Sequence, residues 1–561
     1  MKKKIIFLII LTVALGSDSL ASQKNNRLSL ADTFIGNFSL RLSASLQEKS
    51  PDGPEKKISF SFDDRWESSP FLSDPEKFKR ITSPPKHKLR GFVEFFSLFA
   101  YSGINYNIKY GKFIEDWQYR FTWKDQKRRF FTLEAQQFDS NNFGLNWRHS
   151  LAGMIYYEFA RSNNLTWWQS ALYSVGGSLA WEYMVEWREV ISINDNLMTG
   201  PGGVVLGESW FQLGKYFFNS PHKFTRILSW LNPFMKINGW FDRKHPLPPY
   251  FHSYNPQAQD VYFFIGYRQS PTSTRAQEVS NLDISFNSRI ITRQDYGIPG
   301  KVKEKFNQPI YSQLDLEMMY HGKNREELDL MAKVVPLGWF AQNISDDKKG
   351  YSYYYGLGSA LEVYVKRPVV DYDAEKFAVN QPDEFHFETP RDFRDKLGAI
   401  HLIGPVFDLV YFARPWYFRL GGEAYLSFGM INSLPLNKYS IDHDIRGMKT
   451  TLTYFGYYYA LGPALKYRVN LGYNHLRLEG FLEYLYYHSL QGRDRFQNDL
   501  LDDSPLKDSR WHYGLGLQYQ IPDTSLSIES RLEWVKRWGI IHEIEDHNLE
   551  KRLYLGLKIS L

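Results

Sequence analysis

Apolar and polar residues alternate along the C-terminal part of the chain. From Trp511 to Ile521 every odd-numbered residue is aromatic or aliphatic, whereas the even-numbered residues are His, Gly or Gln. The same period of two recurs over 526–534 and 552–561. A period of two sends successive side chains to opposite faces of a β-strand, so the pattern predicts sheets with one apolar and one polar face. We expect the odd-numbered residues of 511–521 to face lipid, and three even-numbered residues to face a lumen: His512, Gln518 and Gln520.

Short and long connections alternate between these predicted strands. Tight turns are expected at 414–415, 474–475 and 522–523, and long polar loops at 431–448, 489–509 and 539–550. This asymmetry is typical of outer-membrane barrels, which have short periplasmic turns and long outer loops, and it places Leu561 on the periplasmic side.

We therefore predict a mainly β protein, with a transmembrane antiparallel β-barrel of about 12 strands, within a range of roughly 10 to 16, over residues 251–561. The alternative is a soluble β-sandwich with one wet face. Aromatic residues near the strand ends, such as Trp416 and Trp538, favour the membrane barrel. The final Leu561 departs from the aromatic residue with which such barrels usually end.

The N-terminus has the layout of a secretory signal peptide. Lysines at positions 2–4 precede an apolar run from Ile5 to Gly16, and Ser19 and Ala21 form a small-residue cleavage site. We expect cleavage after Ala21 and export across the inner membrane to the cell outer membrane. Residues 22–90 are polar and predict a disordered periplasmic segment, which could contact a periplasmic protein partner. Residues 91–138 predict N-terminal strands, because aromatic and polar residues alternate from Trp117 to Trp123.

Composition excludes several classes of protein. The 561 residues contain no Cys, which rules out disulfides and thiolate metal sites. Mean hydropathy is -0.44, and no 18-residue apolar run follows the leader, which argues against a helical membrane protein. The net charge of +6 is small beside 68 basic and 62 acidic residues that are scattered along the chain, so nucleic acid is not an expected partner.

Residues 139–250 predict a helical insert within this β-rich chain. The segment 143–219 is rich in Ala, Gly, Ser, Trp and Met, and it carries ionisable groups among apolar neighbours. Glu182 and Glu186 are four residues apart and would share one helix face. His149 opens the first helix, and Ser192 could cap another, with Asp195 at the acidic position of a capping box. Small residues such as Gly153 and Gly203 would let these helices approach closely.

These ionisable groups suit two interpretations. Like-charged carboxylates on one face suit acid–base or metal chemistry, so His149, Glu182, Glu186 and Asp195 are candidate catalytic residues, and the first three are weak candidate metal ligands. The alternative, which we favour, is that the groups hydrogen-bond to helix ends and hold the helices to the barrel wall. We expect the four to converge, because unpaired buried charges are costly. Further members of a structural or functional polar cluster are Asp139, Asn146, Arg161, Ser178, Asn194 and Glu208. No HExxH motif, phosphate loop or dinucleotide fingerprint is present, and no cofactor is expected.

Over 139–219 the chain resembles a bacterial family known as domain of unknown function 3943. The resemblance rests on these residues: Asp139, Asn146, His149, Tyr156-Tyr157, Ala160-Arg161-Ser162, Ser178, Trp181-Glu182, Glu186, Ser192-Ile193-Asn194-Asp195, Thr199, Gly202-Gly203 and Gly207-Glu208, with Asn232-Pro233 further on. The family pattern has His-Pro where this chain has His149-Ser150, which leaves the start of the first helix open. The resemblance implies a secreted protein of Gram-negative bacteria, often with a barrel-like remainder, and implies no substrate.

Two functions are compatible with this sequence. In the first, the helical insert plugs the lumen or docks onto the barrel, with a role in transport, scaffolding or envelope maintenance. In the second, the insert is an envelope lipid-modifying or hydrolytic enzyme that uses the His, Glu and Asp cluster. The expected partners are outer-membrane lipid and the barrel-assembly machinery.

Overall fold

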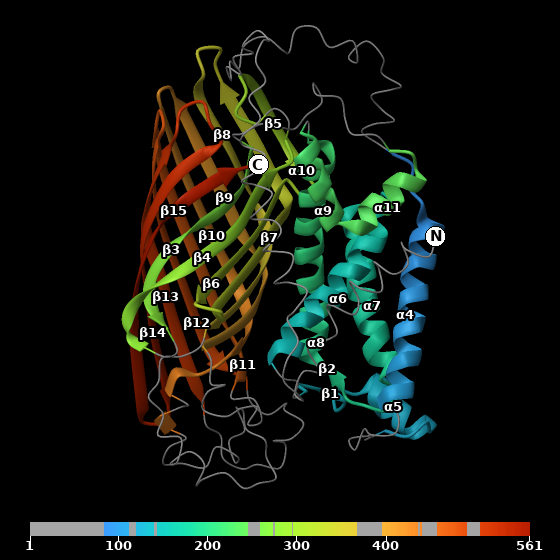
Figure 1. The fold of residues 1–561 in the computed structure, drawn as a ribbon. Helices are drawn as coiled ribbons and strands as arrows, with labels where there is room; N and C mark the ends of the chain where they lie inside the picture. Colours follow the sequence, from blue (N-terminus) through green and yellow to red (C-terminus); the bar gives the residue numbers. More distant parts are fainter. Residues whose placement is uncertain are drawn as a thin grey trace. The chain divides into compact units, whose positions relative to one another are not determined.

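The structure, a computed structural model, describes residues 84–110, 119–139, 143–220, 222–244, 258–272, 275–293, 296–366, 395–435, 438–439, 457–490 and 505–561. The described residues all fall within one compact unit, Phe62–Leu561. The predicted signal peptide lies outside the described residues, as do residues 22–83 of the segment predicted to be disordered over 22–90. The prediction of disorder is wrong for 88–90, which form the start of a helix. Figure 1 shows the two groups of elements that follow, helices from the N-terminal half and strands from the C-terminal half.

The N-terminal half of the described chain is helical. Its elements are α4 (Lys88–Tyr110), α5 (Trp123–Phe131), β1 (Gln136–Gln137), α6 (Phe143–Ser162), α7 (Trp167–Ala180), η2 (Trp181–Val185), β2 (Ile191–Ser192), α8 (Ile193–Leu197), η3 (Met198–Gly202), α9 (Gly203–Asn219), α10 (Lys223–Ile227), η4 (Leu228–Leu231) and α11 (Pro233–Phe241). Among these helices, none is both long enough and apolar enough to cross a membrane.

The prediction of strands over 91–138 is wrong. Helix α4 occupies 88–110 and α5 occupies 123–131, while β1 supplies only two strand residues in this range. Phe92 and Phe96 are four residues apart, as are Phe95 and Phe99, and this spacing is the period of a helix face. Helix α5 begins where the side chain of Thr122 accepts a hydrogen bond from the Asp125 backbone N–H.

The C-terminal half forms a closed antiparallel barrel. Its strands are β3 (Gln259–Thr272), β4 (Arg275–Ile291), β6 (Tyr311–His321), β7 (Asn324–Ile344), β8 (Lys349–Lys366), β9 (Asp395–Ala413), β10 (Trp416–Ile431), β11 (Tyr458–Tyr473), β12 (Leu476–Ser489), β13 (Leu506–Gln520), β14 (Leu526–Ile541) and β15 (Ile544–Ser560). These 12 strands close through the β15–β3 and β7–β8 pairings, as the predicted fold class required. A short additional strand, β5 (Gly300–Phe306), pairs with the end of β7.

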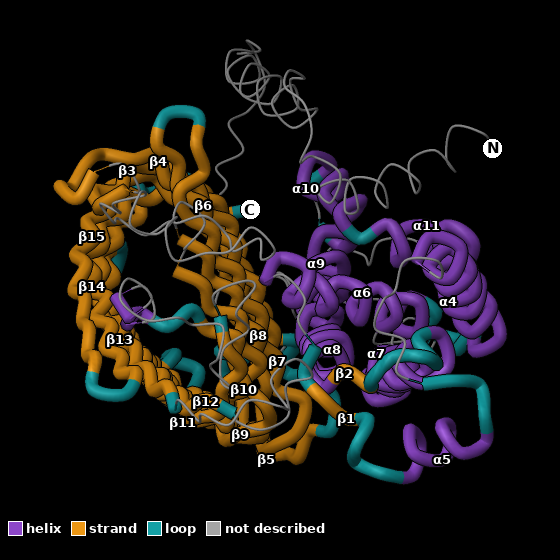
Figure 2. The backbone as a smooth tube through the Cα atoms, turned by 90° about the horizontal axis from the view of Figure 1, so that it is seen from below, coloured by secondary structure: helices purple, strands orange, loops and turns teal. Residues whose placement is uncertain are grey.

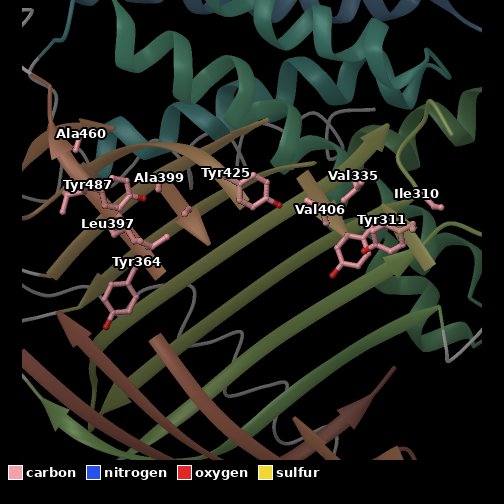
Figure 3. Packing of buried hydrophobic residues seen from close by; sticks show 14 of the residues in the cluster. Ile310, Tyr311, Val335, Tyr364, Leu397, Ala399, Val406, Tyr425, Ala460 and Tyr487 are labelled. Atoms are coloured by element: carbon pink, nitrogen blue, oxygen red, sulfur yellow. The ribbon is translucent and has the colours of Figure 1, made fainter. Parts of the chain in front are cut away.

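The two faces of the wall differ as the alternation predicts. Leu515 and Leu517 of β13 point outward and are exposed. His512, nearer the start of β13, points into the barrel, where its imidazole hydrogen-bonds to the Glu533 carboxylate. Lumen-facing aromatic residues such as Tyr364 and Tyr487 pack into one buried cluster, part of which Figure 3 shows. The polar faces of the strands therefore line the lumen, and the apolar faces form the outer surface.

Most of the predicted connections are present. Two-residue turns join β9 to β10 at 414–415 and β11 to β12 at 474–475, and long connections follow β10 and β12. The predicted long loop at 539–550 is wrong, because β14 and β15 meet in a two-residue turn at His542-Glu543. Residues 544–550 are mostly polar on both faces, so the alternation that marks a strand is lost there.

The helices pack against the outside of the barrel wall. Val334, Leu361, Ile400 and Met430 belong to the outward-facing side of the strands, and they are buried with residues of α6 and α9 in one apolar cluster. The hydroxyl of Tyr216, near the end of α9, donates to the backbone carbonyl of Leu561, 2.6 Å away. Figure 2 shows the helices outside the ring of strands, beside β6, β7 and β8. The prediction that these helices plug the lumen is therefore wrong.

Candidate functional site

The predicted polar residues gather where α6, α8 and the β2 segment meet. Ser192 caps α8 as predicted, and its hydroxyl accepts a hydrogen bond of 3.2 Å from the Asp195 backbone N–H. Asn146 and His149 lie in the first turns of α6, so their side chains reach α8 from the other side. Helix α6 begins at Phe143, and this answers the question of where the first helix starts, which the His149-Ser150 departure from the family pattern had left open.

Asn194 is the hydrogen-bonding centre of this group. Its amide nitrogen donates to carboxylate or amide oxygens of Asp139 at 2.7 Å, Asn146 at 3.0 Å and Asp195 at 3.0 Å. Its carbonyl oxygen accepts from the Asp139 backbone N–H at 3.0 Å and from the Ser192 hydroxyl at 3.1 Å. Asn194 is completely buried, and these partners satisfy its polar atoms.

His149 and Asp195 form an imidazole–carboxylate pair. His149 Nδ1 lies 3.1 Å from Asp195 Oδ1 and 3.2 Å from the backbone carbonyl oxygen of Asn146. Both neighbours accept, which favours the tautomer with the proton on Nδ1. The His149 side chain is 26% exposed, whereas that of Asp195 is 8% exposed.

Glu182 joins the same turn from η2. Its carboxylate accepts a 2.8 Å hydrogen bond from the Ser192 backbone N–H, three residues before Asp195. The Glu186 carboxylate accepts from the Trp181 indole N–H at 2.8 Å and lies near enough to Glu182 and Asp195 to interact with their charges. The four predicted residues therefore gather in one region, with Glu182 and Asp195 hydrogen-bonded to the Ser192 turn, His149 against Asp195, and Glu186 in electrostatic contact.

Arg129 closes the end of η2 and was missed at the sequence level. Its fully buried guanidinium donates to the backbone carbonyls of Tyr183 at 2.9 Å, Glu186 at 3.0 Å and Glu189 at 2.8 Å. A cation at these unpaired carbonyls stabilises a helix C-terminus. Arg129 lay in a segment predicted as strand, so nothing in the local pattern pointed to this role.

Two barrel tyrosines complete the group. The Asn146 amide donates to the hydroxyls of Tyr457 at 2.9 Å and Tyr459 at 2.7 Å. The Tyr459 hydroxyl in turn donates to the backbone carbonyl of Asp139 at 2.9 Å. The cluster therefore joins the helices to the wall, and long-range partners of this kind leave no local sequence signal.

The remaining predicted residues lie apart from His149. Arg161 Nε donates to Glu208 at 2.8 Å, which ties α6 to α9, and the Ser178 hydroxyl donates to the Asn196 amide oxygen at 3.0 Å. Within the described ranges, no group of three or more His, Asp or Glu side chains is arranged to hold a metal ion. The weak metal candidates His149, Glu182 and Glu186 are accordingly not brought together as ligands.

The lumen holds a second set of charged groups, which pair between distant strands. Arg552 on β15 lies 3.2 Å from Glu327 on β7, and its guanidinium donates to the Tyr364 hydroxyl on β8 at 2.8 Å. Arg531 on β14 lies 3.3 Å from Glu317 on β6. Between these pairs is a cavity of about 180 Å³ lined by charged residues of both signs.

Comparison with known proteins matches residues 135–234 to the family described as Domain of unknown function (DUF3943), which confirms the predicted resemblance for this segment. No curated protein matches the chain.

The chain is similar to several solved outer-membrane proteins. One is the NanC porin, with 10% identity, a TM-score of 0.22 and coverage of 54% of this chain and 100% of that one. Another is the β domain of the Bordetella autotransporter BrkA, with 9% identity, a TM-score of 0.19, and coverage of 54% and 100%. A third is the translocator domain of the autotransporter NalP from Neisseria meningitidis, with 8% identity, a TM-score of 0.18, and coverage of 55% and 90%.

Proposed function

We propose that the protein is an outer-membrane β-barrel that serves as a scaffold, holding its DUF3943 segment against the outer wall, with a role in envelope maintenance. The observation that carries this proposal is the set of ion pairs across the lumen, such as Arg552 with Glu327. An open channel requires a continuous aqueous path, whereas these pairs place bonded side chains between non-neighbouring strands inside the lumen and narrow the space there. Transport is therefore the less favoured of the three roles.

The outer surface supports a location in the membrane. Outward residues on strands away from the helices, such as Leu515, Leu517 and Leu555, are exposed and apolar. A contiguous apolar surface of this kind marks contact with lipid or a protein partner, and on a closed barrel it matches the lipid-facing band of outer-membrane proteins. Under this proposal the barrel-assembly machinery inserts the chain, and outer-membrane lipid surrounds it.

Conductance in planar lipid bilayers tests the scaffold proposal. The wild type should insert, migrate heat-dependently on a detergent gel and give no steady open-pore current. The paired variant Arg552→Ala with Glu327→Ala removes two side chains that meet inside the lumen, so it should leak ions. Because Arg268 and Lys366 also lose Glu327 as a partner, heat-dependent migration of the variant must first show that its barrel still forms. Gln518→Ala is the matched control, because Gln518 faces the lumen but bonds only to Ser527 on the adjacent strand. A steady wild-type current of porin type would overturn the proposal in favour of transport.

One observation favours a second function, an envelope lipid-modifying or hydrolytic enzyme. Asp195 holds the Nδ1 side of a partly exposed His149, which is how a carboxylate prepares an imidazole to act as a general base through Nε2. In a host that lacks the protein, His149→Asn should then behave like the empty vector in outer-membrane lipid composition and detergent resistance, with the helical circular dichroism unchanged. Under the scaffold proposal His149→Asn should restore the envelope as the wild type does. Tyr457→Phe is the control, since it alters the same cluster through the Asn146 contact and leaves the His149–Asp195 pair in place.

A further inference from the structure

Helix α4 presents a long apolar stripe away from the rest of the protein. Leu89, Phe92, Phe96, Ile104 and Ile108 recur at spacings that place them on one side of the helix, and all are exposed. The 23 residues of α4 extend about 35 Å at 1.5 Å per residue. That length is similar to the roughly 30 Å thickness of a bilayer's hydrocarbon core. No charged residue lies between Glu94 and Lys109.

Helix α7 adds a second stripe of the same kind. Trp168, Leu172, Val175 and Leu179 are spaced by three or four residues and are exposed, and α7 contains no Asp, Glu, Lys, Arg or His. The opposite face of α7 is buried through small residues, among them Gly177, which lies against Tyr156 of α6. The apolar stripe of α7 is therefore not required for packing within the described helices.

The two stripes lie at the depth of the barrel wall. Helices α6 and α9 run along the wall between the Asn146–Tyr459 bond at one end and the Tyr216–Leu561 bond at the other. Helix α4 packs on α6, where the rings of Phe95 and Tyr156 meet at 5.3 Å. Figure 1 shows α7 and α4 on the side of α6 away from the strands, so their exposed stripes lie alongside the barrel and face away from it.

Aromatic and basic residues lie at the two ends of this layer. Trp240 is exposed near the start of α4, where Arg90 bonds to Asp242 and the basic residues 243–244 follow. Trp123 is exposed in α5, which contains several Lys and Arg residues, is joined to η2 by Arg129 and lies near the far end of α4 in Figure 1. Amphipathic aromatics and cations at both ends of an apolar band are typical of a surface between two membrane–water interfaces.

We infer that the acyl chains of the outer membrane cover α4 and α7, so that the helical domain lies within the bilayer beside the barrel. This inference rests on the proposed membrane location of the barrel and deepens it. The observations favour lipid over a protein partner for three reasons. The stripes lie alongside the lipid-facing wall, α4 is about as long as a bilayer's hydrocarbon core is thick, and aromatic and basic residues lie at both ends of the layer. The inward faces of these helices pack on protein, so acyl chains would cover only the outward stripes.

Single cysteines test the inference cleanly, because the native chain has none. Ile104→Cys on α4 and Leu172→Cys on α7 each replace a side chain that is 62% exposed. Leu515→Cys on the barrel wall is the lipid-facing reference, and Asp346→Cys in the β7–β8 turn is the aqueous reference. Each full-length variant carries a polarity-sensitive fluorophore and is reconstituted into phosphatidylcholine vesicles, with brominated acyl chains as the lipid quencher and iodide as the aqueous quencher.

The labels at Ile104 and Leu172 should lose the same fraction of emission to brominated lipid as the label at Leu515, and less to iodide than the label at Asp346. Iodide quenching of both helix labels, with Leu515 still quenched by lipid, would overturn the inference and leave the membrane barrel standing. Protection of the helix labels from both quenchers would overturn it in favour of a second copy of the chain. Iodide quenching at Leu515 itself would refute the membrane barrel and the inference together.

Discussion

The side-chain amide of Asn146 donates a 2.7 Å hydrogen bond to the hydroxyl of Tyr459, and this bond joins the first turn of α6 to the beginning of β11. Both residues are buried, so water does not compete with either partner of this hydrogen bond. The same hydroxyl donates to the Asp139 backbone, which links three segments distant in the chain. The polar cluster at the helical ends therefore also anchors the helices to the wall.

Removing this hydroxyl should loosen the helical domain. Tyr459→Phe leaves the Asp139 carbonyl and one Asn146 N–H without a partner, and an unsatisfied buried polar group costs roughly 1–3 kcal/mol. We expect a lower free energy of unfolding and earlier loss of helical circular dichroism during a urea titration in lipid vesicles. Tyr467→Phe is the control, because Tyr467 is exposed on the outer wall. Equal stability of the two variants would contradict the anchoring role.

Two glycines of the helical domain should respond in opposite directions to alanine. A Cβ at Gly153 would lie 1.8 Å from the backbone oxygen of Thr199, and backbone there cannot move without separating α6 from η3 and α9. Gly153→Ala should therefore destabilise the domain by roughly 1–3 kcal/mol. A Cβ at Gly176 would meet no atom within 4 Å. Gly176→Ala should raise helix stability by up to about 1 kcal/mol.

Thermal unfolding followed by helical circular dichroism separates these two variants. The transition of Gly153→Ala should move below that of the wild type, and that of Gly176→Ala should not. A Gly153→Ala protein as stable as the wild type would show that α6 and α9 are not in the close contact described above.

The barrel was predictable because lipid and lumen act as different solvents on the two sides of each strand. Residues 511–521 record that difference at every position. The prediction was wrong where the difference disappears, as in 544–550, which extend β15 with polar residues on both faces. It was also wrong for α4. This helix has aromatic residues on its exposed side, such as Phe92, and on its packed side, such as Phe95, so its sequence resembles that of an aromatic-rich strand.

The candidate site was predictable only in its local part. Ser192 and Asp195 carry a capping signal within four residues, and the structure has that cap. The contacts of Arg129 and of Tyr457 and Tyr459 join segments that are tens to hundreds of residues apart. A single sequence contains no periodicity that specifies such contacts.

We expect the two faces of the barrel wall to differ in their tolerance of an added charge. Leu517→Arg places a cation among outward apolar residues, and a charge on the lipid face near mid-bilayer costs roughly 2–4 kcal/mol. Gln518→Arg places the same cation in the lumen, where Gln518 already bonds to Ser527 and charged groups line the cavity. The fraction of heat-modifiable barrel on a detergent gel should fall for Leu517→Arg and stay near the wild-type value for Gln518→Arg. Equal tolerance of both changes would argue against a lipid-facing wall at β13.

The junction between α4 and α11 should weaken in acid. The Arg90 guanidinium donates to both carboxylate oxygens of Asp242, at 2.7 and 3.1 Å, and His87 and Lys244 lie nearby. Burial alone would raise the pKa of Asp242, but the hydrogen bonds and charge of Arg90, with the charges of Lys244 and His87, lower the pKa below its ordinary value of 3.8. A lowered folded-state pKa means that the stability from the ionised group is present above the unfolded value and is lost as pH falls through the folded value. The free energy of unfolding of wild type minus Asp242→Asn should therefore be constant above about pH 5 and shrink below about pH 4. A difference that is independent of pH down to the acid limit would show that Asp242 contributes through packing and not through its charge.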